Sequence, residues 1–147
     1  MTTAREFRLL AVAQVDEPGG AEVALLRLAP RLLRRGWKVT VTTPGDGAVA
    51  EAARALGCDT AALPVGGLSG GPAAAARAVA AWPQARRLAK AHDTVLLNGT
   101  AAGRLLPAVA STRCRTVLHV HDLVDRVPQH WRRADAVLAP ALSLIHI

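Results

Sequence analysis

Residues 7–35 read FRLLAVAQVDEPGGAEVALLRLAPRLLRR, with two glycines between an apolar run and a helical pattern. Phe7–Val15 predicts a buried strand, and Ala21–Arg35 predicts a helix that begins directly after the glycines. The first N–H groups of a helix have no partner within it, and glycine has no Cβ that would keep a ligand away. We therefore expect an anionic or sugar-phosphate group to approach the backbone closely at Gly19 and Gly20.

The composition is that of one globular domain with a core of Ala, Leu and Val. Of the 147 residues, 51% are hydrophobic but only 3% are aromatic, which suits helices packed closely on a parallel sheet. No apolar stretch is long enough to span a bilayer, and Met1–Val15 lacks the separate charged and apolar regions of a signal peptide. Cys58 and Cys114 have no metal-type spacing, so we expect two reduced thiols in a cytoplasmic protein.

The net charge is +7, and arginine supplies nearly all of the excess. One interpretation is contact with the inner face of an anionic membrane, and another is nucleic-acid binding. The arginines are spread over all predicted helices, and no aromatic residues lie between them for base stacking. We therefore favour a GC-rich genome as the origin of the arginines, keep peripheral membrane contact as the alternative and expect no nucleic-acid partner.

Apolar strand-like runs alternate with helical patterns along the chain. The expected strands are Phe7–Val15, Lys38–Thr43, Thr60–Leu63, Asp93–Leu97, Thr116–Val120 and Ala136–Ala139. The expected helices are Ala21–Arg35, Gly47–Leu56, Pro72–Ala91, Thr100–Ala110 and a shorter one at Pro128–Arg133. This alternation predicts an α/β fold, a Rossmann-like doubly wound parallel sheet with helices on both faces.

Three local patterns refine this expectation. In the first helix, three- and four-residue spacing predicts a sheet-facing side made of Ala21, Ala24, Leu25, Leu28 and Leu32. Gly36 is expected to end that helix. The glycine-rich segment Pro64–Pro72 predicts a mobile surface loop, and Trp82-Pro83 predicts a break in the third helix.

In a doubly wound sheet, ligands bind beyond the carboxyl ends of the strands. Asp16 to Gly20 come after the first strand, Thr43 to Gly47 stand at the end of the second, and Asn98 to Thr100 follow the fourth. The fifth strand ends in His119 to Asp122. Glycines, an amide, imidazoles and carboxylates thus gather along one edge. The sequence therefore predicts a binding cleft at that edge.

Single residues of this cleft have more than one interpretation. Asn98 can bond a sugar hydroxyl or cap the next helix. His121 stands at the tip of a strand, where its imidazole can reach the crevice, whereas His119 is expected to be internal. Asp122 can orient the His121 ring or cap the following turn.

The motifs of several other enzyme classes are absent. There is no G-x-G-x-x-G, and Thr42-Thr43 stand where an acidic ribose-binding residue belongs, so an NAD-dependent oxidoreductase ranks last. There is also no G-x-x-x-x-G-K-[ST] loop, so an NTPase interpretation lacks its phosphate cradle.

Residues 15–22, VDEPGGAE, followed by Leu28–Leu32 and Arg35–Val41, resemble the start of family 4 glycosyltransferases of GT-B fold. Those proteins read GG-x-E and then L-x-x-x-L-x-x-x-G-H-x-V-x-V, and Trp37 replaces the usual His here. The segments that continue the likeness in the same order are Leu97–Thr100, Val117–Leu123 and Ala134–Pro140. The resemblance covers residues 7–140.

The resemblance implies a retaining, hexosyltransferase-like enzyme that moves a sugar from a nucleotide-sugar donor to a sugar, lipid or small-molecule acceptor. Gly19 and Gly20 would lie against the donor diphosphate, and His121 would contact the transferring sugar as the catalytic residue. We add Asn98 and Asp122 as substrate-binding residues. The family pattern needs no metal, and we expect no further cofactor.

On this resemblance, residues 1–141 form the N-terminal, acceptor-side domain, and the C-terminal nucleotide-sugar domain is absent. We expect residues 142–147 to be a non-native tail and the chain to be a fragment that is inactive alone. The alternative is a stand-alone Rossmann-like module that binds a small anionic ligand such as a nucleotide or sugar phosphate. Calorimetric titration with such ligands distinguishes the two.

Overall fold

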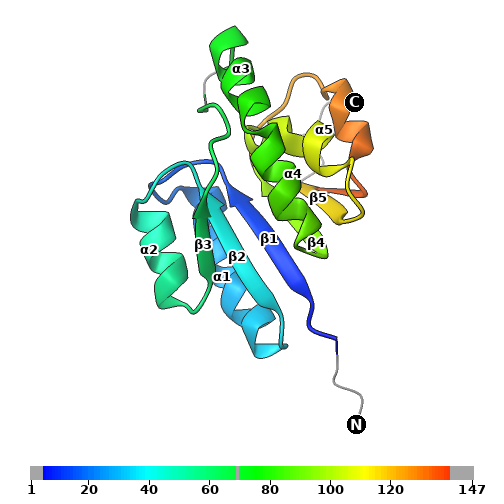
Figure 1. Ribbon diagram of the computed structural model, residues 1–147. Coiled ribbons are helices and arrows are strands. Elements are labelled where there is room, and N and C mark those ends of the chain that lie inside the picture. The colour runs from blue at the N-terminus through cyan, green and yellow to red at the C-terminus, as the bar shows by residue number, and fades with distance from the viewer. Residues whose placement is uncertain (1–4, 69, 140–147) are drawn as a thin grey trace.

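The computed structural model describes residues 5–68 and 70–139, and within them six strands form one parallel sheet (Figure 1). The strands are β1 (Arg8–Ala13), β2 (Lys38–Thr43), β3 (Asp59–Ala62), β4 (Thr94–Asn98), β5 (Arg115–His119) and β6 (Ala136–Leu138). Their order in the sheet is β3-β2-β1-β4-β5-β6. From β1 the chain adds β2 and β3 on one side, then returns and adds β4, β5 and β6 on the other side of β1. This order confirms the predicted doubly wound sheet.

Helices cover both faces of the sheet. They are α1 (Gly20–Arg34), α2 (Ala48–Ala55), α3 (Pro72–Ala80), α4 (Trp82–Lys90), α5 (Leu106–Val109) and the 3₁₀ segments η1 (Ala102–Leu105) and η2 (Gln129–Arg133). The buried residues of α1 and α2 pack in one apolar cluster with β1 and β2. Those of α3, α4, α5, η1 and η2 pack in a second cluster on the opposite face.

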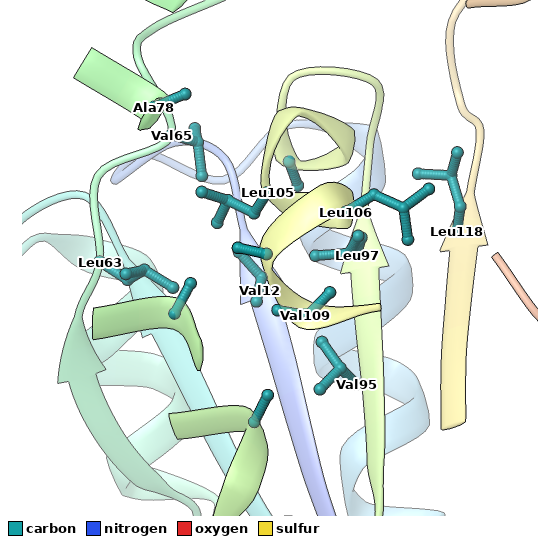
Figure 2. Packing of buried hydrophobic residues seen from close by; sticks show 14 of the residues in the cluster. Val12, Leu63, Val65, Ala78, Val95, Leu97, Leu105, Leu106, Val109 and Leu118 are labelled. Carbon is teal, nitrogen blue, oxygen red and sulfur yellow. The ribbon is translucent and has the colours of Figure 1, made fainter. Parts of the chain in front are cut away.

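The central strand β1 has side chains in both clusters, so it is buried on both faces. Val12 of β1 meets Leu97 of β4 and Leu105 of η1 in the second cluster (Figure 2). Both clusters consist almost wholly of Ala, Val and Leu, as the composition predicted. Buried alanines leave little side-chain bulk between helix and sheet, so the helices can lie close to the strands.

Two helical patterns are divided at prolines. The pattern 72–91 separates into α3 and α4 at Trp82-Pro83, as predicted, and the Trp82 indole N–H donates to the carbonyl of Arg104 at 3.0 Å. The pattern 100–110 was expected to be one helix, but it is η1 followed by α5. Pro107 has no N–H to donate, so it fits only in the first turn of a new helix.

The sheet-facing side of α1 differs from the prediction. Ala24 and Leu28 are exposed, the latter by 39%, whereas Glu22 is buried at 2% exposure. Glu22 turns its carboxylate back to the backbone N–H of Gly19 (3.0 Å), which lets a charged residue occupy the buried side. The helix ends as expected, because Gly36 follows it with a φ of 86°.

The segment Pro64–Pro72 was predicted to be a mobile surface loop, and the surface position is wrong for Val65 and Gly66, which are buried. Val65 is fully buried in the second apolar cluster, and its carbonyl accepts a hydrogen bond from the Arg104 guanidinium at 3.1 Å. Only farther along does the segment open to solvent, with Leu68 60% exposed. The glycine- and proline-rich composition of the segment therefore gave no sign that Val65 belongs to the core.

Cys58 and Cys114 are buried and free, and burial raises the pKa of both thiols. Among the residues that the structure describes, no helix has the length and apolarity needed to cross a membrane. The predicted tail, residues 142–147, lies outside the described residues.

Candidate functional site

A cleft of about 690 Å³ opens where the strand order reverses, at the carboxyl ends of β1 and β5. The residues that line it are Gln14, Val15, Glu17, Pro18, Gly19, Gly20, Ala21, Glu22, Leu68, His121 and Asp122. The structure thus brings the glycine pair and the His121-Asp122 pair, which are about a hundred positions apart in sequence, to one cleft. Asn98 lies directly behind this lining.

The glycine pair leads into the first turn of α1. Gly19 has extended backbone (φ −104°, ψ −167°), and Gly20 is the first residue of the helix. A Cβ added to Gly20 would meet no atom within 4 Å. Since neither the backbone conformation nor the packing requires glycine at position 20, its small size is available for the close approach of a ligand.

Asn98 fixes the imidazole of His121. Asn98 is 1% exposed, and its Nδ2 donates to the carbonyl of Ala21 at 2.8 Å while its Oδ1 lies 3.0 Å from His121 Nε2. A carbonyl can only accept, so the amide must face Ala21 with its nitrogen and His121 with its oxygen. His121 Nε2 must therefore carry a proton, and in the neutral ring Nδ1 is the acceptor.

The surroundings of His121 favour that neutral ring. Burial lowers its pKa from the ordinary value of 6.5, and the negative charges of Asp122 and Glu22 only partly oppose this effect. The half-buried His119 ring lies 3.9 Å away between centroids, and burial followed by the charge of His121 lowers the pKa of His119 as well. Two adjacent imidazoles disfavour double protonation because their positive charges repel.

Asp122 and Asn98 make contacts that the sequence did not single out. Asp122 was expected to orient His121 or to cap a turn, but its Oδ2 accepts from Thr100 Oγ1 at 2.8 Å, and Asn98 holds the ring instead. The hydrogen bond from Thr100 joins the loops that follow β4 and β5. For Asn98, the structure shows bonds to Ala21 and His121 in place of a helix cap.

Sequence reasoning missed the parts that Gln14 and Glu22 play at the cleft. Gln14 Oε1 accepts from the N–H of Ala101 at 3.0 Å, and its side chain packs where a Cβ on Gly99 (φ 126°) would lie, 2.2 Å from Oε1. Glu22 Oε2 accepts a hydrogen bond from the N–H of Gly19, while the buried Oε1 has no hydrogen-bond partner among the described residues. In the sequence, only the polar Gln14 within an apolar run could have pointed to these contacts.

The cleft is acidic. Glu17, Glu22 and Asp122 line it, and no Lys or Arg does. Across residues 5–68 and 70–139, no three His, Cys, Asp or Glu side chains gather as a metal site. The arrangement therefore offers carboxylates, one neutral imidazole and a helix N-terminus, which together suit a ligand rich in hydroxyl groups.

Residues 18–146 match the model of Glycosyltransferase Family 4. The chain belongs to this family. In fold the chain is similar to MurG from Acinetobacter baumannii, with a TM-score of 0.73, 19% identity and coverage of 97% of this chain and 43% of MurG. It is also similar to HepE from Anabaena, whose structure is a complex with UDP, with a TM-score of 0.68, 20% identity and coverage of 94% and 39%.

At these identities the structural likeness shows the fold, which is that of the N-terminal domain of a GT-B glycosyltransferase. The chain spans about two fifths of the length of the two solved structures. No curated protein sequence matches it.

Proposed function

We propose that the complete glycosyltransferase moves a hexose from a nucleotide-sugar donor to a hydroxyl-bearing acceptor, with retention at the anomeric carbon, in the cleft beside α1. The observation that carries this proposal is the meeting of the glycine pair and His121 in one cleft of about 690 Å³. HepE, which has a similar fold, has been solved with UDP, in keeping with a nucleotide-linked donor.

In this proposal the donor diphosphate lies against the first turn of α1. The unpaired N–H groups and the positive end of the helix dipole favour an anion there, and Gly20 leaves room for it. Asp122 binds a sugar hydroxyl with its second carboxylate oxygen. His121 contacts the transferring sugar and presents Nδ1 as an acceptor, because Asn98 holds the proton on Nε2.

The acidic cleft also supports the proposal that a second domain, and not this one, binds the charged part of the donor. A diphosphate carries negative charge, and no Lys or Arg lines the cleft to balance it. The chain spans about two fifths of MurG and HepE. We therefore propose that a second α/β domain supplies the nucleotide site and the cations, and that the present chain is inactive alone.

Titration calorimetry of the 147-residue chain with UDP tests this proposal. We expect no binding in the cleft at millimolar UDP, that is, no binding that Gly20→Val removes, because the charge of the diphosphate stays uncompensated there. Binding with a Kd of about 10 μM or lower that Gly20→Val removes would contradict the two-domain proposal. It would favour the alternative of a stand-alone module for small anionic ligands.

In the full-length protein, Gly20→Val should reduce turnover by about 10- to 100-fold, because a branched side chain moves the donor away from α1. The melting temperature should stay close to that of the wild type, since the added Cβ meets open space. Gly70→Val is the matched control, because Gly70 also has no atom near its Cβ position and does not line the cleft. Equal turnover of the two variants would remove Gly20 from the donor site.

A further inference from the structure

A second hollow, of about 850 Å³, lies at the opposite end of the sheet from the cleft. It is bounded by the residues before and at the start of β1 and β4, the end of α4, and the turn before β5. We call it the amino-edge groove and define it by Arg5, Phe7, Trp37, Lys90, Arg113 and Arg115. Strands of five or six residues separate it from the cleft by about 15–20 Å, so the two are distinct sites.

The side chains of three cations of the groove have no partner. The charged groups of Lys90, Arg113 and Arg115 make no hydrogen bond or ion pair with any residue in the described ranges, whereas the Arg5 guanidinium is paired with Asp93. Among the described residues, Asp93 is the one carboxylate that lines the groove. The N–H of Arg8 and then the Arg5 guanidinium hold the pKa of Asp93 below its ordinary value, so its charge is already balanced.

The helix dipole explains only one of these cations. Lys90 lies in the last turn of α4, where a positive charge offsets the negative helix end. Arg113 belongs to the turn after α5, and Arg115 is the first residue of β5. Neither arginine forms an ion pair within the described residues, although Asp93 and Asp135 line the hollows on either side of them. Because the cations outnumber the carboxylates, the groove keeps a net positive charge.

The other walls of the groove suit an organic ligand. Phe7, 46% exposed, stacks on Trp37 with 5.1 Å between ring centroids, which forms an apolar wall. The Ser111 and Thr112 hydroxyls beside the arginines already donate to the carbonyls of Ala108 and Val109 at 2.6 Å, so the guanidinium groups are the donors that face a ligand. A hollow with two unpaired guanidinium groups and an aromatic wall matches a phosphate joined to a carbon framework.

We propose that the amino-edge groove binds the phosphate of a soluble phosphate ester or of an anionic lipid headgroup through Lys90, Arg113 and Arg115. The phosphate oxygens accept from the two guanidinium groups, and the Lys90 ammonium adds charge. The site lies away from the sugar-transfer cleft and does not depend on it.

The test compares two double variants that each remove two positive charges. Arg113→Gln/Arg115→Gln changes the groove, and Arg27→Gln/Arg31→Gln changes two exposed arginines of α1 that do not line it. Each protein is titrated with pyrophosphate by calorimetry. Each is then sedimented with vesicles of phosphatidylglycerol in phosphatidylcholine, with pure phosphatidylcholine as the blank. Thermal melts check that the folds are intact.

The groove variant should bind at least about tenfold more weakly than the wild type, and the α1 variant should bind almost normally. This pattern with pyrophosphate supports a soluble phosphate ester. The same pattern with vesicles alone supports a lipid headgroup, and with both ligands it supports the phosphate itself as the recognised group. Absence of binding to either ligand, or equal losses in the two double variants, overturns the proposal.

Discussion

Asn98 determines which nitrogen of His121 carries the proton. The amide spans from the first turn of α1 to the residue just beyond β5, so it links that helix to the imidazole. Both of its polar groups are used inside the protein, and its side chain is buried. An aliphatic residue or a carboxylate of similar size cannot make both bonds.

The variant Asn98→Asp should lower the free energy of unfolding by about 1–3 kcal/mol, because the carbonyl of Ala21 loses its donor in a buried position. The new carboxylate should also raise the pKa of His121 by favouring the imidazolium. Urea denaturation measures the first effect, and an NMR titration of the imidazole measures the second. An unchanged pKa of His121 would contradict the assigned contact.

At the scale of elements, the alanine-rich helix surfaces set how closely the helices approach the sheet. Ala78 of α3 is 1% exposed and lies in the second apolar cluster near Val65 (Figure 2). Ala76 of the same helix is exposed. The same substitution at the two positions therefore distinguishes an effect on core packing from an effect on helix propensity.

Ala78→Leu should lower the free energy of unfolding by about 1–3 kcal/mol, because extra methyl groups overfill a close-packed contact. Ala76→Leu, the matched control, should change it by less than about 0.5 kcal/mol. Chemical denaturation of both variants measures the difference. Equal stabilities would mean that α3 does not pack tightly on the core.

The elements also show what periodicity can and cannot predict. Every expected strand is present within two residues of its predicted bounds. The central strands β1 and β4 are buried apolar runs, which makes them easy to recognise, whereas the residues of the edge strands β3 and β6 are half-buried or exposed. Periodicity failed on α1, where Leu28 is exposed and Glu22 is buried. The reason is a local hydrogen bond from Gly19 to Glu22, which a hydrophobicity pattern does not contain.

The candidate site was predictable as a place but not as a set of contacts. Strand ends meet at one edge, so the sequence placed Gly19, Gly20 and His121 together. The bond between Asn98 and His121 joins the last residue of β4 to the segment after β5, 23 positions farther along the chain. Which side chain Asn98 meets there depends on the exact register of the two strands. The sequence suggested that Asp122 could orient the His121 ring, whereas in the structure Asn98 is the residue that holds it.

For the whole molecule, partly buried histidines couple stability to pH. Burial lowers the pKa of His119, His121 and His130 in the folded protein from the ordinary value of 6.5. Below pH 6.5 the unfolded chain takes up protons that the folded chain resists. Their contribution to stability is therefore present above pH 6.5 and is lost as the pH falls.

The free energy of unfolding should decrease between pH 7.5 and pH 5.5, and His119→Asn/His121→Asn should flatten that decrease. Urea denaturation at several pH values gives both slopes. Greater stability at pH 5.5 than at pH 7.5, or equal slopes for the two proteins, would contradict the assignment.

The central place of β1 has a consequence for synthesis of the chain. β1 leaves the ribosome about 80 residues before β4, which begins at Thr94 and pairs with it. Until β4 emerges, one edge of an apolar strand stays open to other nascent chains. Chaperone demand should therefore be greatest while the ribosome translates the segment between β3 and β4.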